Sequence, residues 1–533
     1  MRERNELILA DLIAARAEQA PGFDVVTFDG GGVRPHEVRT YADLWMNGNR
    51  IAAGLMAKGL GKGDRFGLMM RNHPEFIETM VAASLSGGVF VPIDPRTRGE
   101  KLAYTLRNSE CRGIVCADYA LAQVAAVRND LPNLEWILVL ESREEPDSVP
   151  TGDVPGAEPF APILDTPERY VTARADTPGD PLEIIYTSGT TGDPKGVVCA
   201  NGRYVGASAM GYLMGLQPGD RPYNGLSLTH GNAQIVTLAP SLVMKLRAVF
   251  SRRFTKSRLW DVCREHGCTV FNLLGGMATA IYSEPPKPND ADNPVRMVLS
   301  GGMPAALWRA FEDRFNVKIL EAYAAVEGGL AINPIGVGPI GSFGKPPPTL
   351  EMKIVDDQGN ECPPGVVGEL ISRPSTGERV EVEYFKNKEA SQSKTRGGWL
   401  RSGDMCHRDA DGWFYFDFRK GGGIRHNGDF VNPGFVEKVI AEDPQVDDVF
   451  VYGVPAASGA PGERDVVAAV VPVDASSFDP ASVFATCAKG LESNFVPSYL
   501  QVVDEIPKTA SEKPQERFLM DRFAPDGPRI YRQ

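Results

Sequence analysis

The sequence lacks any apolar run long enough to cross a membrane, and this removes one whole class of protein. A transmembrane helix needs about 20 consecutive apolar residues, whereas the apolar 42% of this chain is spread over shorter runs. Residues 1–19 mix acids with bases in the pattern of an amphipathic helix. They have neither the basic start nor the small-residue cleavage site of a signal peptide. We therefore expect a cytoplasmic protein with no membrane span.

Excess positive charge and paired cysteines are also missing. Asp and Glu outnumber Lys and Arg by 69 to 56, and the formal net charge is −13. Proteins that bind nucleic acid need a clustered basic surface instead. The eight cysteines form no CxxC pair, so reduced thiols that serve packing are expected. We expect no nucleic-acid partner, and an anionic ligand would have to meet a local concentration of positive groups.

The length of 533 residues predicts more than one domain, because a single hydrophobic core stops growing well below this size. From Tyr41 to about Leu140, helical patterns alternate with short apolar runs. This alternation predicts β-α-β units on a largely parallel sheet. After Glu369 the chain becomes rich in glycine and charge, and residues 421–423 are three consecutive glycines that predict a hinge. The remaining residues predict a small α+β domain.

The stretch TSGTTGDPKG, residues 187–196, concentrates groups that bind phosphate. It supplies hydroxyls, glycines that let backbone N–H groups approach an anion, and one lysine. The candidate ligand-binding residues are Thr187, Ser188, Gly189, Thr190, Thr191 and Lys195. The stretch is not a Walker loop, because Pro194 precedes the lysine, Gly196 follows it and the chain continues as a strand. A mobile surface loop is the simpler alternative, but this composition favours a polyphosphate site.

This stretch resembles the signature loop of the adenylate-forming superfamily, which comprises acyl-CoA and aryl-CoA synthetases, peptide-synthetase adenylation domains and luciferases. Other stretches resemble the motifs of the family in order along the chain: RTYADL (39–44), GGVFVPIDP (87–95), LSGGMP (299–304), LEAYAAVEGG (320–329), GWLRSGDMCHRDADGWFYFDFR (398–419) and IPKTASEKPQERF (506–518). The resemblance implies an α/β fold with two domains. Residues 1–419 would form a large N-terminal domain of parallel-rich sheets, helices and a β-barrel-like part. Residues 420–533 would form a small, mobile α+β domain that carries the catalytic lysine.

The resemblance also assigns residues to the nucleoside half of ATP. Gly301 and Gly302 lie in the segment that lines adenine, and Tyr323 supplies the aromatic ring against it. Asp404 is expected to accept hydrogen bonds from both ribose hydroxyls, and Arg419 is the arginine at the domain boundary. A carboxylate suits two hydroxyl donors because it needs no proton of its own.

Catalysis is assigned by the resemblance to Lys513, Glu327 and Thr187. Lys513 takes the place of the catalytic lysine, and its motif position favours it over Lys508. Glu327 is the metal ligand expected to hold Mg²⁺, an ordinary surface carboxylate being the alternative. The adjacent Glu512 is expected to raise the pKa of Lys513.

The chain departs from the family pattern at four positions. Ala324 and Val326 replace a usual glycine and threonine, Glu512 replaces a glycine, and Gly421 stands where a hinge aspartate or lysine is common. These departures keep open a catalytically altered homologue that only binds nucleotide.

The acid-binding pocket is the least specified part of the site. His230 is the candidate gate for the substrate carboxylate, although a packed histidine is an equal alternative. Asn272 and Gly275 belong to the expected opposite wall, residues 270–282, and Ala324 and Ala325 leave space. The stretch HGNAQ and this wall look most like the crotonobetaine/carnitine-CoA ligase branch.

The implied function is ATP-dependent acid:CoA ligation. A carboxylic acid is activated as acyl-AMP with release of pyrophosphate, and the acyl group then passes to CoA, giving acyl-CoA and AMP. ATP, Mg²⁺ and CoA are the expected cofactors, and Gly428 would lie near the site of thioester formation. Loading of a carrier-protein pantetheine is the alternative, although no carrier domain is fused to the chain. The acid stays open, and so does the oligomeric state, for which a homodimer is considered.

Overall fold

The computed structural model describes residues 3–144, 148–167, 170–187, 194–420, 424–426, 429–431, 433–457, 464–491, 495–509 and 512–533. The chain divides into two compact units. The first comprises Met1–Leu273, Asp292–Leu299 and Glu381–Ser393, and the second comprises Leu274–Ala291, Ser300–Val380 and Lys394–Gln533. The expected domain boundary between residues 419 and 420 falls inside the second unit and stays a prediction.

One sheet of the first unit has seven strands in the order β7-β6-β5-β3-β4-β8-β9. Their bounds are Ala157–Pro159 (β7), Trp136–Leu140 (β6), Cys111–Ala117 (β5), Arg65–Met69 (β3), Val89–Pro92 (β4), Pro181–Thr187 (β8) and Lys195–Ala200 (β9). Neighbours are parallel from β7 to β8, and β8 pairs antiparallel with β9. The expected β-α-β alternation is confirmed.

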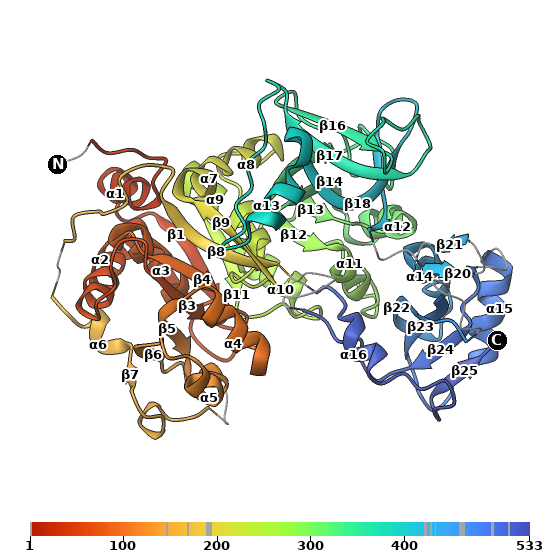
Figure 1. Cartoon of the computed structure of the whole chain (residues 1–533), viewed down its shortest axis with the longest axis horizontal. Helices are drawn as coiled ribbons and strands as arrows, with labels where there is room; N and C mark the ends of the chain where they lie inside the picture. Colours follow the sequence, from red (N-terminus) through yellow and green to blue (C-terminus); the bar gives the residue numbers. More distant parts are fainter. Residues whose placement is uncertain are drawn as a thin grey trace. The chain divides into compact units, whose positions relative to one another are not determined.

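Helices cover both faces of this sheet. Their bounds are Tyr41–Ala57 (α2), Pro74–Ser86 (α3), Gly99–Asn108 (α4) and Asp118–Val127 (α5). The chain moves in one direction from β3 to β4 through α3, and back from β4 to β5 through α4. Right-handed crossovers therefore place α3 and α4 on opposite faces. Figure 1 shows α2 and α3 on one side of these strands and α4 and α5 on the other.

Six strands of a second sheet belong mainly to the first unit, in the order β13-β12-β10-β11-β1-β2. Their bounds are Met297–Gly301 (β13), Val270–Leu274 (β12), Pro222–Asn224 (β10), Ala248–Ser251 (β11), Asp24–Asp29 (β1) and Glu37–Thr40 (β2). β1 is parallel to β11 and antiparallel to β2. Further helices of the first unit are Leu9–Gln19 (α1), Ala161–Leu164 (α6), Asn201–Gly206 (α7), Ala209–Leu213 (α8), the π-helix Ala233–Leu238 (η3), Ala239–Met244 (α9) and Leu259–His266 (α10).

The second unit contains an all-β part, as expected from the barrel-like region of the family. β14 (Lys318–Ala325) and β15 (Gly328–Asn333) form an antiparallel hairpin. β16 (Leu350–Val355), β17 (Gly368–Pro374), β18 (Leu400–Arg408) and β19 (Phe414–Arg419) form a four-stranded antiparallel sheet. A small core of buried side chains, including Ala331, Phe343, Ile354, Leu370 and Phe414, joins the hairpin to the sheet. Helices α11 (Gly275–Tyr282) and α12 (Ala305–Phe315) precede the hairpin. Helix α13 (Lys388–Lys394) belongs to the first unit except for its last residue.

The C-terminal part of this unit has the expected α+β composition. Four strands pair in the order β22 (Val446–Pro455), β23 (Arg464–Pro472), β24 (Tyr499–Val502) and β25 (Ile530–Arg532). A two-stranded ribbon, β20 (Ile424–His426) and β21 (Asp429–Val431), and helices α14 (Pro433–Ile440), α15 (Pro480–Gly490) and α16 (Glu516–Met520) complete it. Both faces of β23 are buried: Val466, Ala468 and Val470 belong to one apolar core, and Val467 and Ala469 to another. Alternation along a strand explains the two sets.

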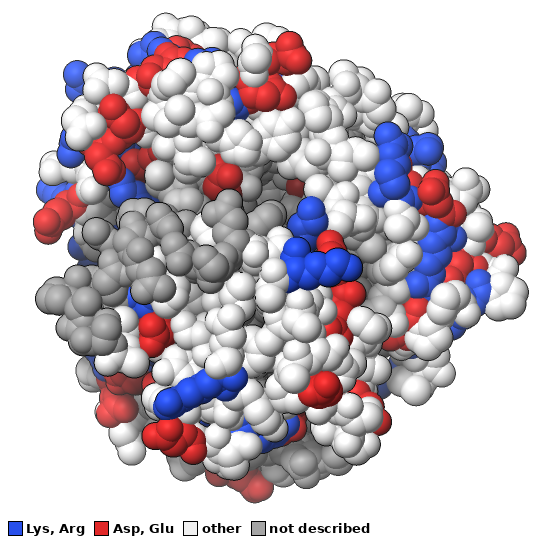
Figure 2. Space-filling view, turned by 90° about the vertical axis from the view of Figure 1, so that its right-hand side faces the viewer, with Lys and Arg blue, Asp and Glu red and all other residues white. Residues whose placement is uncertain are grey.

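Three sequence expectations can be compared with the described residues. None of the helices there combines the length and the apolar composition that a bilayer span requires. All eight cysteines are buried free thiols, as expected for packing residues. On the face drawn in Figure 2, Lys and Arg are interspersed with Asp and Glu, and much of the remaining described surface is uncharged. The absence of a nucleic-acid partner stays a prediction.

Candidate active site

The predicted phosphate loop connects the two strands of the β8–β9 hairpin. Thr187, the last residue of β8, lies opposite Lys195, the first residue of β9. The Thr187 hydroxyl donates to the Lys195 carbonyl at 3.4 Å, and the Lys195 ammonium lies 5.8 Å from the centroid of the Tyr384 ring. Lys195 is exposed, so its cation is available at the base of the loop. Ser188, Gly189, Thr190 and Thr191 lie outside the described residues, and their roles stay predictions.

A buried carboxylate shapes the segment predicted to line adenine. Gly302 has a φ of +94°, a conformation that favours glycine. The carboxylate of Glu321, on β14, accepts the amide N–H of Gly302 through one oxygen and that of Met303 at 3.1 Å through the other. Burial raises the pKa of Glu321 to about 7, although the two amides oppose the shift. Glu321 therefore joins Gly301 and its neighbours to the strand that carries Tyr323.

Tyr323 and Asp404 are joined by a direct hydrogen bond. The Tyr323 hydroxyl donates to Oδ2 of Asp404 at 2.6 Å, and the Tyr323 ring lies 4.9 Å from that of Phe343. Burial and the adjacent carboxylate of Asp404 raise the pKa of Tyr323 well above its usual range. Tyr323 thus stays protonated and keeps donating to Asp404.

The second oxygen of Asp404 is available for a ligand. Asp404 lies opposite Arg419 in the β18–β19 pair, and Nε of Arg419 is 3.2 Å from Oδ1. Arg419 and Asp404 form an ion pair, but the contact does not have hydrogen-bond geometry. Within the described part of the chain, the buried Oδ1 accepts no hydrogen bond. A buried acceptor without a donor is costly. Two vicinal hydroxyls of a ribose would supply the missing donor, so these residues fit a nucleotide.

Glu327 lies in the turn between β14 and β15, immediately after Ala324, Ala325 and Val326. Its side chain is only 10% exposed, and its carboxylate lies 3.6 Å from the Lys394 ammonium. The same ammonium donates to the Ser402 carbonyl at 3.1 Å. A carboxylate oxygen is a suitable ligand for Mg²⁺, and Lys394 offsets the negative charge of this largely buried group. The alternative, an ordinary surface carboxylate, does not fit this burial.

Lys513 lies in a tight turn of the C-terminal segment. The Thr509 amide donates to the Lys513 carbonyl at 2.8 Å, and the Lys513 amide donates to the Thr509 hydroxyl at 3.1 Å. Glu512, in the same turn, has a φ of +58°. This left-handed conformation is one that glycine adopts without strain, which accounts for the glycine that the family usually has there.

Burial and charged groups act on the pKa of the Lys513 ammonium, some lowering it and others raising it. Although the residue retains exposed surface, desolvation of the ammonium by nearby protein lowers the pKa, and the Arg419 guanidinium lowers it further. The carboxylates of Asp404 and Glu327 act in the opposite direction. The expected rise caused by Glu512 is therefore wrong, because desolvation and Arg419 outweigh the nearby carboxylates. Arg419, Asp404 and Glu327 thus all act on the Lys513 ammonium, and the catalytic and binding roles that the motifs assign to these residues stay predictions.

Lys508, the alternative catalytic lysine, is paired elsewhere. Its ammonium bonds to Oδ2 of Asp448. This partner is a residue of β22 with no place in the predicted site. The arrangement favours Lys513 as the residue that meets the nucleotide.

The predicted acid-binding residues are only partly brought together. The backbone N–H of Asn232 donates to Nδ1 of His230 at 3.2 Å, and the side-chain NH2 of Asn272 donates to Oδ1 of Asn232. Asn232 therefore links two residues that sequence reasoning had selected, although it was not itself selected. The π-helix Ala233–Leu238 begins at the next residue, and π-helical turns are frequent at functional sites. Gly275, Ala324 and Ala325 belong to the second unit, and their part in a pocket stays a prediction.

The remaining residues fall into two groups, predicted residues that the structure does not describe and residues of the site that were not predicted. Gly428 and the glycines at 421–423 lie outside the described residues. Glu321 and Lys394 were missed. Glu321 could have been found from its position, because it is a carboxylate inside an apolar strand, two residues before Tyr323. Nothing in the sequence indicated Lys394.

Comparison with known families and proteins gives concordant results. The family described as AMP-binding enzyme matches residues 13–377, and the AMP-binding enzyme C-terminal domain matches residues 436–513. Medium/long-chain-fatty-acid–CoA ligase FadD17 of Mycobacterium tuberculosis is 31% identical over 487 residues, which cover 90% of this chain and 91% of the relative. Crotonobetaine/carnitine–CoA ligase of Salmonella typhi is 28% identical, with 89% of this chain and 91% of the relative covered.

The fold is also that of a solved CoA ligase. The crystal structure of the anthranilate CoA ligase AuaEII in complex with anthranoyl-AMP superposes with a TM-score of 0.82. The two sequences are 22% identical, and the match covers 96% of each chain. At this identity the likeness establishes the architecture alone.

Proposed function

Because the chain belongs to the AMP-binding enzyme family, we propose that it is an ATP-dependent acid:CoA ligase. It activates a carboxylic acid as acyl-AMP with release of pyrophosphate, and then transfers the acyl group to CoA with release of AMP. One observation carries this proposal. The Arg419 guanidinium and two carboxylates, those of Asp404 and Glu327, act electrostatically on the Lys513 ammonium. A cation at that position is what the first step requires.

The first step brings two anions together. A carboxylate oxygen of the acid attacks the α-phosphorus of ATP, and pyrophosphate leaves. The ammonium of Lys513 reduces the repulsion between the carboxylate and the α-phosphate and stabilises the charge that develops between them. Lys195, at the base of the predicted loop, is assigned to the β- and γ-phosphates together with the hydroxyls of residues 187–191. Positioning and charge stabilisation then account for catalysis.

The nucleoside is assigned to the neighbouring residues of the same unit. Oδ1 of Asp404 accepts from the ribose, while the Tyr323 hydroxyl occupies Oδ2. Glu321 holds the amides of Gly302 and Met303 in place beside the adenine position. Mg²⁺, when bound, neutralises phosphate charge, and Glu327 would hold it. Lys394 keeps the Glu327 carboxylate oriented through their ion pair.

The second step joins the acyl group to sulfur. The thiolate of CoA attacks the acyl carbonyl of acyl-AMP, and AMP leaves. We assign Gly428 to this half-reaction and the domain boundary to residues 419 and 420. The separate family match of residues 436–513 supports a distinct C-terminal domain.

We propose that His230, Asn232 and Asn272, which are linked by hydrogen bonds, help to select the acid. Relatives are named for medium- and long-chain fatty acids and for crotonobetaine and carnitine, and a similar fold is named for anthranilate. These names define a panel of acids to test. Gly275, Ala324 and Ala325 stay candidate residues for binding the acid.

The proposal is tested with the purified chain, ATP, Mg²⁺, CoA and this panel of acids. Pyrophosphate release that depends on the acid, followed by acyl-CoA and AMP, is the expected result. Acyl-AMP that reacts with a carrier-protein pantetheine but not with CoA would favour the carrier-loading alternative. ATP binding with no pyrophosphate release from any acid would favour a catalytically altered homologue and contradict the proposal.

Location and assembly are proposals of the same kind. A cytoplasmic location is supported by the eight buried free thiols, because reduced cysteines are usual there. A homodimer is a second proposal, which light scattering coupled to gel filtration can test.

A further inference from the structure

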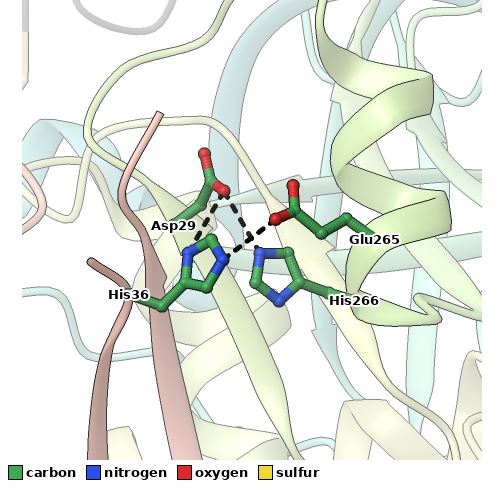
Figure 3. Close-up of side chains that lie close together, drawn as sticks. All are labelled: Asp29, His36, Glu265 and His266. Carbon is green, nitrogen blue, oxygen red and sulfur yellow. Dashed lines mark hydrogen bonds and ion pairs between the residues drawn. The ribbon is translucent and has the colours of Figure 1, made fainter. Parts of the chain in front are cut away.

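Four potential metal ligands lie together in the first unit, and none of them has a role in the proposed function. Asp29 ends β1, His36 directly precedes β2, and Glu265 and His266 end α10. Figure 3 shows their side chains pointing toward one another from these three elements. One ligand atom from each residue lies within 4.8 Å of every other.

The two oxygens of Asp29 have different surroundings. Oδ2 accepts the Gly31 amide at 3.0 Å and lies 3.8 Å from the Arg258 guanidinium. Oδ1 faces the imidazoles, at 3.2 Å from Nε2 of His266 and 3.6 Å from Nδ1 of His36. Asp29 is therefore held through one oxygen, while the other is directed at two potential nitrogen ligands.

The hydrogen bonds around His36 indicate which ring nitrogen could bind an ion. The Gly30 amide donates to Nδ1 at 3.1 Å, so Nδ1 carries the lone pair. Nε2 then carries the proton and donates to the Glu265 carboxylate at 3.0 Å. Histidines that bind metals commonly donate their second N–H to a carboxylate in this way. An ion at Nδ1 would take the place of the Gly30 amide.

We propose that Oδ1 of Asp29, Nδ1 of His36 and Nε2 of His266 bind a divalent transition-metal ion, with Zn²⁺ as the preferred occupant and Glu265 orienting His36. Ligands around a tetrahedral Zn²⁺ with bonds of about 2.0–2.1 Å are about 3.3–3.5 Å apart. The separations of 3.2 and 3.6 Å from Oδ1 bracket this value. Two imidazoles and a carboxylate are ligands that suit zinc.

Two of the four side chains are buried and two are partly exposed, so an ion can reach the site from solvent. The side chains of Asp29 and His266 are 3% and 6% exposed, whereas those of His36 and Glu265 are 35% and 50% exposed. The ion would connect the end of β1, the β1–β2 connection and the end of α10. Because it binds only the folded arrangement, it would stabilise the fold by mass action.

The experiment uses the full chain without an affinity tag, treated with a chelator, refilled with Zn²⁺ and freed of excess metal by gel filtration. Elemental analysis should find one equivalent of zinc, and thermal unfolding should shift upward with Zn²⁺. His36→Gln, at a half-exposed position, and His266→Asn should lose the bound zinc and the thermal shift. Glu265→Gln should retain a site weakened about 10- to 100-fold.

The matched control is His407→Gln. His407 also pairs with a carboxylate, Asp417, at 2.8 Å, but it has no part in the cluster, so zinc content should not change. No zinc retained by the unsubstituted chain, or equal zinc in a folded His36→Gln variant, would overturn the proposal. Circular dichroism of each variant separates loss of the site from loss of the fold. Neither readout depends on ligase activity.

Discussion

Asp404→Asn is the substitution that most directly tests the nucleotide site. In the structure, Oδ2 of Asp404 accepts the Tyr323 hydroxyl, and the buried Oδ1 accepts no hydrogen bond from the described part of the chain. Asparagine replaces one of the two acceptor oxygens with an NH2 donor, so that either the Tyr323 hydroxyl or the ribose loses its acceptor. The loss of one charge-assisted hydrogen bond costs about 1.5–3 kcal/mol. The Kd for ATP should therefore rise roughly 10- to 150-fold.

Isothermal titration with ATP and Mg²⁺ measures this Kd directly. Tyr323→Phe is the matched control, because it keeps the ring and the Asp404 carboxylate and removes only the hydroxyl. We expect Tyr323→Phe to change the Kd by a few-fold at most. Unchanged ATP binding by a folded Asp404→Asn variant would refute the assignment of Oδ1 to the ribose.

The other predictions concern the C-terminal segment. Lys513→Ala should slow acyl-AMP formation at least about 100-fold and spare thioester formation from supplied acyl-AMP. The control Lys508→Ala should spare both half-reactions. Equal loss of both half-reactions in Lys513→Ala would contradict the assigned role. Because the cation is the active form and the pKa of Lys513 is lowered, adenylation should fall as pH rises, with a midpoint below that of an ordinary lysine. The Arg419 guanidinium repels the Lys513 ammonium and lowers its pKa, so Arg419→Gln should move the midpoint of the pH profile of adenylation upward. An unchanged midpoint would count against this repulsion. Glu512→Val should destabilise the chain by about 1–2 kcal/mol, since a branched side chain is strained at a φ of +58°, whereas Glu512→Gly should not; thermal unfolding distinguishes the two.

The parallel sheet could be predicted because its signals are local. The strand at Arg65–Met69, the helix at Pro74–Ser86 and the strand at Val89–Pro92 each carry their own hydrophobic period and bounding glycines or proline. The order of the strands was not predictable in this way. Pairing of β4 with β8 depends on contacts between segments about 90 residues apart in the sequence, which no local period reveals.

The site residues also divide into those that local motifs identify and those that only the fold brings into place. Motifs identified Lys513, Asp404, Arg419 and Glu327, and the structure brings their charges together. Lys394 could not be found, because a lysine at the end of a polar helix has no signature until folding places it beside Glu327.

The direction of the Lys513 pKa was predicted wrongly for a physical reason. The sequence shows a carboxylate at the adjacent position, Glu512, and neighbouring opposite charges usually raise the pKa of a lysine. In the folded chain, desolvation and the Arg419 guanidinium dominate instead. Burial and long-range charge belong to the fold, and a single stretch of sequence does not contain them.

The Glu321 carboxylate has a consequence for proton balance. Its pKa is raised to about 7, so its protonated and ionised forms have similar free energies near neutral pH. Only the ionised form offers a full acceptor oxygen to each of the Gly302 and Met303 amides. A nucleotide that favours the ordered segment would release a proton as it binds, and by reciprocity its affinity would rise as pH increases through 7. A strand residue that need not touch ATP would thus link adenine binding to the acidity of the solution.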